Sequence, residues 1–194
     1  MSSAAALINR GLADYGYAYM NIDDAWEAEE RAPDGRIEAN EKFPDMLIVG
    51  KVGWSSSLRD SSLTPDEQYT HISLWSLLAA NMLIGCDIAQ IDDFTFNLLC
   101  NNEVNAVNQD ILGHQAHQDV IEDGIQIWSR DLSDGSFAVG IFNLNDTSVT
   151  VQLDGALAKI GLEAGSVRDL WRQKDIDADA EYVIPSHGVL YVKV

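Results

Sequence analysis

The sequence is poor in basic residues, cysteine and proline, and it has no long hydrophobic run. Its 194 residues include 12 lysines and arginines against 31 aspartates and glutamates, giving a formal net charge of -19. This charge repels phosphate backbones and anionic lipid headgroups, so the sequence predicts no nucleic-acid partner and no membrane-surface partner. Since no apolar run approaches the roughly 20 residues that cross a bilayer, no membrane span is predicted.

The two cysteines, Cys86 and Cys100, lie in the apolar segments IGCDI and NLLCN. Free thiols fit these surroundings better than a disulfide framework does. The N-terminal residues MSSAAALINRG carry no basic stretch ahead of the apolar run, which argues against a signal peptide. The sequence therefore indicates no compartment.

The first half of the chain has the pattern of an α/β layer. Residues 3–15 favour a helix, and the apolar and aromatic residues 17–24 favour a strand. Residues 82–87, MLIGCD, are typical of a buried strand, and residues 92–100 of a helix with an acidic start. This alternation of strands and helices predicts a parallel α/β layer.

The strongest helix signal begins at Thr64. Thr64 and Glu67 have the T-x-x-E spacing of a capping box, and Pro65 stands in the first turn, where its missing N–H is not needed. Apolar residues follow at helical spacing, so we expect this helix to continue to about Ala80.

After Gly113 the pattern changes to short runs of alternating polar and apolar residues, separated by turn signals such as Ser133-Asp134-Gly135. The runs cover residues 125–130, 137–144, 149–153, 165–171 and 188–194. They predict an antiparallel all-β domain. Residues 115–124 are the expected joint, which divides the chain into domains at 1–113 and 114–194.

Six segments resemble the α-galactosidases of glycoside hydrolase family 27. They are GYAYMNIDDAW, GRIEANEKFPDM, PDMLIVGKVGW, QYTHISLWSLLAANMLIGCDI, NNEVNAVNQDILG and VRDLWRQKD, and together they cover almost the whole chain. The resemblance implies a (β/α)8 TIM barrel followed by a C-terminal β-sandwich. It also implies a galactose-containing oligosaccharide or glycoside as the ligand, and no cofactor.

The sequence departs from the family pattern in length. A complete barrel takes about 250 residues, whereas fewer than half of that number precede the predicted β domain. By the family's order, the first strand and roughly the third to sixth barrel repeats have no counterpart here. We therefore expect an incomplete TIM-barrel remnant followed by a complete β-sandwich.

The missing repeats would carry the catalytic groups. The family's retaining mechanism needs a carboxylate nucleophile and a second carboxyl group as acid/base, about 5 to 5.5 Å apart. In the family the nucleophile is the Asp of a K-Y-D motif on the fourth strand, and the acid/base follows the sixth strand. Neither motif occurs in this sequence, so the resemblance supplies no catalytic residue.

Part of a sugar site remains. Asp23 and Asp24 match paired aspartates that the family uses to accept hydrogen bonds from galactose hydroxyls. Taken alone, such a pair is more often a loop or helix cap, but the surrounding GYxYxNIDDxW favours the sugar-binding interpretation. Trp26 either provides an aromatic wall for the sugar or packs in the protein interior.

The tripeptide Pro44-Asp45-Met46 matches two places in the family. In D-P-D-M, near the seventh strand, the equivalents of Asp45 and Met46 line the galactose pocket. In F-P-D-M, at the end of the second βα loop, they do not. The tripeptide is therefore the expected seam at which the missing repeats would have been lost.

Two other patterns are weak. His114 and His117 lack a nearby cysteine or carboxylate partner in the sequence pattern, so solvated linker residues are the simpler interpretation than a metal site. The run DIDADAE at 175–181 opens like a calcium loop but has Ala180 where the loop needs Gly, and it is read as a solvated acidic turn.

Three interpretations of function stay open. The chain is an α-galactosidase by descent, a non-catalytic sugar-binding or structural remnant, or a fragment of a full-length enzyme. Because two or three parallel strands cannot close a barrel, unpaired strand edges would also promote self-association.

Overall fold

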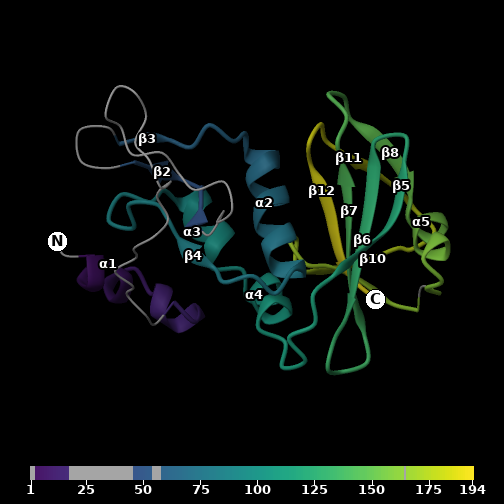
Figure 1. Ribbon diagram of the computed structural model, residues 1–194, viewed down its shortest axis with the longest axis horizontal. Coiled ribbons are helices and arrows are strands. Elements are labelled where there is room, and N and C mark those ends of the chain that lie inside the picture. Colours follow the sequence, from purple (N-terminus) through teal and green to yellow (C-terminus); the bar gives the residue numbers. More distant parts are fainter. Residues whose placement is uncertain (1–2, 18–45, 54–57, 164) are drawn as a thin grey trace, which may run out of the picture.

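The computed structural model describes residues 3–17, 46–53, 58–163 and 165–194. Its helices there are α1 (Ser3–Asn9), the 3-10 helix η1 (Leu12–Tyr15), α2 (Pro65–Leu77), α3 (Asp93–Leu99), α4 (Asn102–Asn108) and α5 (Leu153–Lys159). The short strands of the first half are β1 (Met46–Leu47), β2 (Lys51–Val52), β3 (Arg59–Asp60) and β4 (Leu83–Ile84). Figure 1 shows α2 between these strands and the long strands of the second half.

The second half is a β-sandwich. Its strands are β5 (His117–Glu122), β6 (Ile125–Asp131), β7 (Phe137–Asn143), β8 (Val149–Gln152), β9 (Val167–Asp169), β10 (Lys174–Ile176), β11 (Glu181–Ile184) and β12 (Val189–Lys193). Six of them form an antiparallel sheet in the order β10-β9-β12-β7-β6-β5, and β11 pairs with β8 in a second sheet. The predicted antiparallel domain is confirmed.

Strand β7 is buried on both faces because its side chains alternate between two cores. Val139 and Ile141 join the core between the sheets and α5. Ala138 and Phe142 join the core that includes α2. Between them Gly140 brings β7 close to α2, since a Cβ at Gly140 would lie 2.7 Å from Cδ1 of Leu77.

Polar contacts also join α2 to the sandwich. The hydroxyl groups of Ser76 and Tyr191 lie 2.9 Å apart, and the buried Arg130 donates through Nη1 to the Ser76 carbonyl at 3.0 Å. Trp171 Nε1 donates to Ser73 Oγ at 2.8 Å. With the shared apolar core, these contacts make α2 part of the same packed unit as the large sheet.

Helix α4 is fixed to the sandwich by its N-terminal residues. Asn101 accepts from the backbone N–H groups of Glu103 and Val104, and its Nδ2 donates to the Leu170 carbonyl at 2.9 Å. Arg168 on β9 forms a forked ion pair with Glu103, at 2.6 Å for the shortest contact. A two-pronged pair of this kind sets orientation as well as distance.

The first half is an α/β remnant. Strands β1 and β4 pair in parallel, with Met46 opposite Leu83 and Leu47 opposite Ile84, while β2 and β3 form an antiparallel pair. Leu47, buried on β1, packs in the core that α2, α3 and α4 share. The parallel pairing and the sandwich agree with the predicted fold class, a TIM-barrel remnant followed by a β-sandwich.

The predicted helix at Thr64 is confirmed in detail. Thr64 Oγ1 accepts from the Glu67 N–H at 3.3 Å, and a Glu67 carboxylate oxygen accepts from the Thr64 N–H at 2.7 Å. Asp92 caps α3 by accepting from the Thr95 N–H at 2.7 Å. Both described cysteines are free thiols, with Cys100 buried and Cys86 half-buried.

Three expectations about local structure were wrong. The helix over 3–15 is interrupted because Gly11 adopts φ of +77°, and a 3-10 turn follows. The strand over 82–87 shortens to two residues. Residues 117–122, expected as part of a joint, form β5, an exposed strand at the sheet edge whose polar side chains mask the strand signal.

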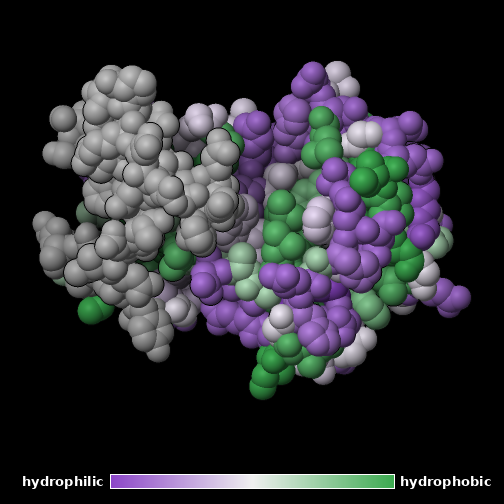
Figure 2. All heavy atoms as spheres, in the orientation of Figure 1, coloured by the Kyte–Doolittle hydropathy of each residue, from purple (hydrophilic) through white to green (hydrophobic). Residues whose placement is uncertain are grey.

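The surface of the sandwich carries both hydrophilic and hydrophobic side chains. On the face shown in Figure 2, hydrophilic side chains surround groups of hydrophobic ones over the sandwich. Among the residues that the structure describes, no helix has the length and apolar character to cross a membrane.

Candidate carbohydrate-binding site

The structure locates one of the five residues that the sequence assigns to sugar binding. Met46 begins β1 and is 37% exposed. The other four, Asp23, Asp24, Trp26 and Asp45, lie outside the described residues. Their role as a group stays a prediction.

The described residues enclose a pocket of about 330 Å³ beyond the carboxyl ends of the parallel strands β1 and β4. In sheets of this kind, ligands bind at the carboxyl ends of the strands. The pocket is lined by Gly50, Lys51, Asp60, Ser61, Leu63, Pro65, Gln68, Gln90, Asp92, Phe94 and Thr95. Its position is therefore on the face of the barrel remnant where a ligand is expected.

Gln68 and Gly50 build one wall of the pocket. The buried Gln68 accepts from the Gly50 N–H at 3.2 Å and donates to the Leu63 carbonyl at 3.0 Å, which ties the chain after β1 to the start of α2. Gly50 has φ of +66°, and a Cβ there would lie 2.7 Å from the Thr95 methyl group. Only glycine suits this backbone and this close approach.

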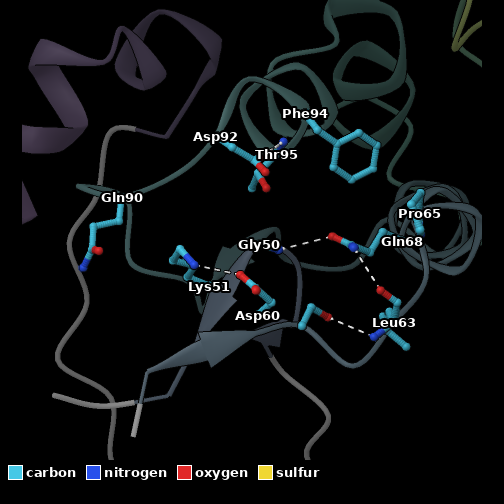
Figure 3. Close-up of a pocket in the computed structure, with 11 residues that line it drawn as sticks. Gly50, Lys51, Asp60, Leu63, Pro65, Gln68, Gln90, Asp92, Phe94 and Thr95 are labelled. Carbon is cyan, nitrogen blue, oxygen red and sulfur yellow. Dashed lines mark hydrogen bonds and ion pairs between the residues drawn. The ribbon is translucent and has the colours of Figure 1, made fainter. Parts of the chain in front are cut away.

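Three charged side chains line the pocket. Lys51 Nζ lies 2.8 Å from Asp60, and this contact raises the pKa of Lys51. Hydrogen bonds from Thr95 lower the pKa of Asp92 and keep its carboxylate ionised. Figure 3 shows Lys51 and Asp60 on one side of the opening and Asp92 on the other. Two carboxylates and one ammonium group give the lining an excess of one negative charge.

An aromatic side chain supplies the apolar part of the lining. Phe94, in the first turn of α3, packs edge-on against Tyr69 with ring centroids 5.7 Å apart. Tyr69 in turn packs edge-on against Trp171 at 4.7 Å. This row of rings connects the pocket to the sandwich and fixes the Phe94 ring.

His71 on α2 contacts the segment that follows β1 and leads to the pocket. Its Nε2 accepts a hydrogen bond from the Ile48 N–H at 3.3 Å, and its ring lies 4.2 Å from the Trp75 ring. Acceptance requires the neutral imidazole. Burial lowers the pKa of His71 to about 4.

This histidine should make stability fall in mild acid. Neutral His71 favours the folded protein fully above pH 6.5, the pKa of an unfolded-state histidine. This contribution to stability is lost as pH falls toward 4, because the unfolded state binds a proton that the folded state does not. Because the ring is only half-buried, we expect the parent to lose about 1 to 2 kcal/mol more than His71→Gln between pH 7 and pH 5. Urea unfolding at the two pH values measures the difference.

The glutamine variant keeps an acceptor for the Ile48 N–H but does not titrate. Equal pH dependence in the parent and in His71→Gln would contradict the prediction.

The patterns considered for metal binding do not assemble a site in the part of the chain that the structure describes. His114 pairs with Asp131 at 3.0 Å and His117 with Asp119 at 2.7 Å, as separate exposed pairs. Asp175, in the acidic run, pairs with Arg168. No group of three or more potential ligands is found among these residues.

Sequence reasoning missed the pocket residues. Asp92 was recognised only as the acidic start of a helix, and Lys51 and Gln90 were not singled out. Their common signal is position, because each follows one of two parallel strands. Recognising it requires knowing that β1 and β4 are neighbours, although paired residues such as Leu47 and Ile84 are 37 positions apart in the sequence.

Two family models match the chain. The model described as Alpha galactosidase A matches residues 42–110, and the model described as Alpha galactosidase C-terminal beta sandwich domain matches residues 122–194. The chain belongs to the α-galactosidase family of glycoside hydrolases. Within this family, the α-galactosidase of Cyamopsis tetragonoloba is 36% identical over 151 residues, which are 75% of this chain and 34% of that protein.

Solved structures of the family share the fold. α-Galactosidase I from Mortierella vinacea superposes with a TM-score of 0.63 at 26% identity, over 77% of this chain and 38% of its own. A family 27 β-L-arabinopyranosidase from Geobacillus stearothermophilus gives a TM-score of 0.66 at 27% identity, over 77% and 36%. The chain spans about a third of the length of the curated relatives it matches.

Proposed function

We propose that this α-galactosidase-like chain binds a terminal α-galactosyl residue and does not cleave its glycosidic bond. The observation that carries the proposal is the pair of family matches, which together cover parts of both the barrel remnant and the sandwich. The proposed substrate class is a galactose-containing oligosaccharide or glycoside. The proposed domains are a remnant of the catalytic domain at 1–113 and a sandwich domain at 114–194.

The proposed sugar-binding residues are Asp23, Asp24, Trp26, Asp45 and Met46. Two adjacent carboxylates suit the galactose ring because each accepts hydrogen bonds from hydroxyl groups. Met46 is exposed on β1, where a ligand could reach it. No residue is proposed as catalytic, since the K-Y-D nucleophile motif does not occur in the sequence.

Calorimetric titration with galactose tests the binding. Asp24→Ala should remove a charge-assisted acceptor and weaken binding at least about tenfold. Glucose, which differs from galactose in the orientation of one hydroxyl group, should bind less tightly. Asp14→Ala, a change of one exposed aspartate in η1, serves as the charge-matched control. Identical heats for the parent and Asp24→Ala would remove the proposal for these residues.

The short span of the matches favours a second candidate, a fragment of a full-length enzyme. In that case the residues that are missing here would be supplied by the complete protein. The tripeptide at 44–46 fits two places in the family, so this is where the sequence of a full-length enzyme would depart from the present one. Reading the transcript across codons 38 to 54 distinguishes this candidate from the binding chain. Self-association through unpaired strands of the remnant is proposed for the binding chain alone.

A further inference from the structure

The geometry points to a second carbohydrate site: we propose that the pocket between Lys51, Asp92 and Phe94 binds one neutral pyranose ring. The proposal uses none of the residues proposed above for galactose binding, and it does not depend on that proposal. Its described lining comes from the segment after β1, the end of β3, the start of α2, and the start of α3 with the segment that leads into it.

The charges of the pocket exclude most other ligand classes. Asp60 and Asp92 outnumber Lys51, and Lys51 is already paired with Asp60 at 2.8 Å. An anion would therefore meet net repulsion. A bare metal ion would need several converging ligands, and the described residues contain no such group. Among neutral ligands, a molecule rich in hydroxyl groups is the one that can bond to both the carboxylates and the ammonium group of this lining.

Hydroxyl groups match the free bonding capacity of the lining. A carboxylate has about four acceptor positions, and the Asp92 carboxylate uses only part of them in capping α3. The Lys51 ammonium has three donors, of which one contact to Asp60 is seen. A sugar offers donors and acceptors in one ring, so it can bond to Asp92 and Lys51 at once.

The apolar side of the pocket suits the C–H face of a sugar ring. Phe94 is held edge-on by Tyr69, so its ring is fixed before a ligand arrives. Figure 3 shows Phe94 and Gln68 on the side of the opening away from Gln90. The volume of about 330 Å³ lies near the lower end of the range for small-molecule sites. It therefore fits a single ring better than an oligosaccharide.

The wall beside Gly50 is rigid, which favours binding. Gln68 uses both ends of its side-chain amide to hold Gly50 and Leu63. Gly50 itself lies against Thr95, with no space for a side chain. A preformed wall reduces the ordering that a ligand must impose.

The test is a titration of the full chain carrying Asp24→Ala, so that the first proposed sugar site is disabled. The probes are methyl α-D-galactopyranoside, methyl α-D-glucopyranoside and inorganic phosphate, followed by NMR up to about 50 mM. We expect a methyl pyranoside to bind with a Kd of about 1 to 10 mM, with perturbed signals at Lys51, Gln90 and Phe94. Phosphate should neither bind nor compete.

Asp92→Asn, added to this protein, should weaken binding about tenfold, because it removes the charge from the strongest acceptor. Asparagine is as good an N-cap as aspartate, so α3 should remain folded. Asp93→Asn is the matched control, since Asp93 is the next residue in the same turn but does not line the pocket. It should leave Kd unchanged. Gln90→Ala, at an exposed lining position, provides a second variant and should weaken binding severalfold.

Three results would overturn the proposal. They are no sugar binding up to about 50 mM, binding that is equally affected by Asp92→Asn and Asp93→Asn, and stronger binding of phosphate than of either pyranoside. Its failure is distinct from failure of the first site. If Asp24→Ala does not change galactose binding but Asp92→Asn does, only the site at Asp23 and Asp24 is lost.

Discussion

An aryl α-galactoside incubated with this chain should be hydrolysed no faster than in buffer alone. Enzymes accelerate reactions by factors of about 10⁶ or more, and a retaining glycosidase depends on two carboxyl groups about 5 to 5.5 Å apart. The sequence contains no K-Y-D motif to supply the nucleophile. Release of the coloured phenol, followed over hours at high protein concentration, measures the residual rate.

Five of the described carboxyl groups are held in the ionised form and do not suit the role of acid in the first step. A general acid at neutral pH needs a raised pKa, so that it holds a proton to give to the leaving group. In the part of the chain that the structure describes, every carboxyl group with a shifted pKa is shifted downward. These groups are Glu67, Asp92, Asp110, Asp131 and Asp134. Hydrogen bonds to the ionised form cause each of these shifts.

Asp24→Ala separates activity of this chain from contamination by a host enzyme. A trace rate that is equal in the parent and in Asp24→Ala belongs to a contaminant. A parent rate well above buffer that Asp24→Ala abolishes would show hydrolysis by this chain and would refute the proposal that it binds without cleaving.

Leu77→Ala should lower the free energy of unfolding by about 3 to 5 kcal/mol, the range for a fully buried leucine whose removal leaves a cavity. Leu77 is 0% exposed at the end of α2, and its Cδ1 faces Gly140 of β7. It thus packs at the contact between the barrel remnant and the sandwich. Urea unfolding, followed by tryptophan fluorescence, measures the loss.

The fluorescence reports both halves, since Trp75 lies on α2 and Trp128 on β6. We expect one cooperative transition at a lower urea midpoint, because α2 shares its core with the large sheet. Ile111→Ala is the control: Ile111 is 89% exposed, and its removal should change stability by less than about 0.5 kcal/mol. Equal midpoints for Leu77→Ala and Ile111→Ala would show that the contact does not stabilise the protein.

The parts of the fold that could be predicted from the sequence are those with local signals. The capping box of Thr64 and Glu67 places the start of α2, and Asp92 places the start of α3. Strands β6 and β7 follow from alternation and from the turn at Gly135, which adopts φ of +85°. In each case neighbouring residues alone determine the geometry.

The missed elements depend on distant contacts. Helix α4, with the sequence NEVNAVN, is only seven residues long, and its first turn is held by Asn101, which bonds to Leu170 in the sandwich. Strand β5 is mostly polar and exposed, with Val120 and Ile121 as its apolar residues, and it forms because β6 provides a pairing partner. Isolated helices of this length are marginal in water, so α4 depends on its contact with the sandwich, as β5 depends on its pairing with β6.

The candidate site residues also fall into those that a sequence motif indicates and those that only the fold brings together. Asp23, Asp24, Trp26, Asp45 and Met46 could be proposed because the family motif is contiguous in the sequence. The second pocket could not, since Lys51 and Asp92 are neighbours only after β1 and β4 pair. Its existence also depends on the close approach of Gly50 to Thr95, which no pattern in either segment indicates.

The docking of α2 onto the large sheet has a consequence for synthesis on the ribosome. The partner of Ser76 is Tyr191, 115 residues further along the chain, and the carbonyl that receives the Thr70 hydroxyl is 117 residues away. Because synthesis adds about 5 to 20 residues per second, β12 and the turn before it are made roughly 6 to 23 seconds after the residues of α2 that they contact. During translation this helix is therefore an exposed apolar surface, and the final residues of the chain decide whether it is covered.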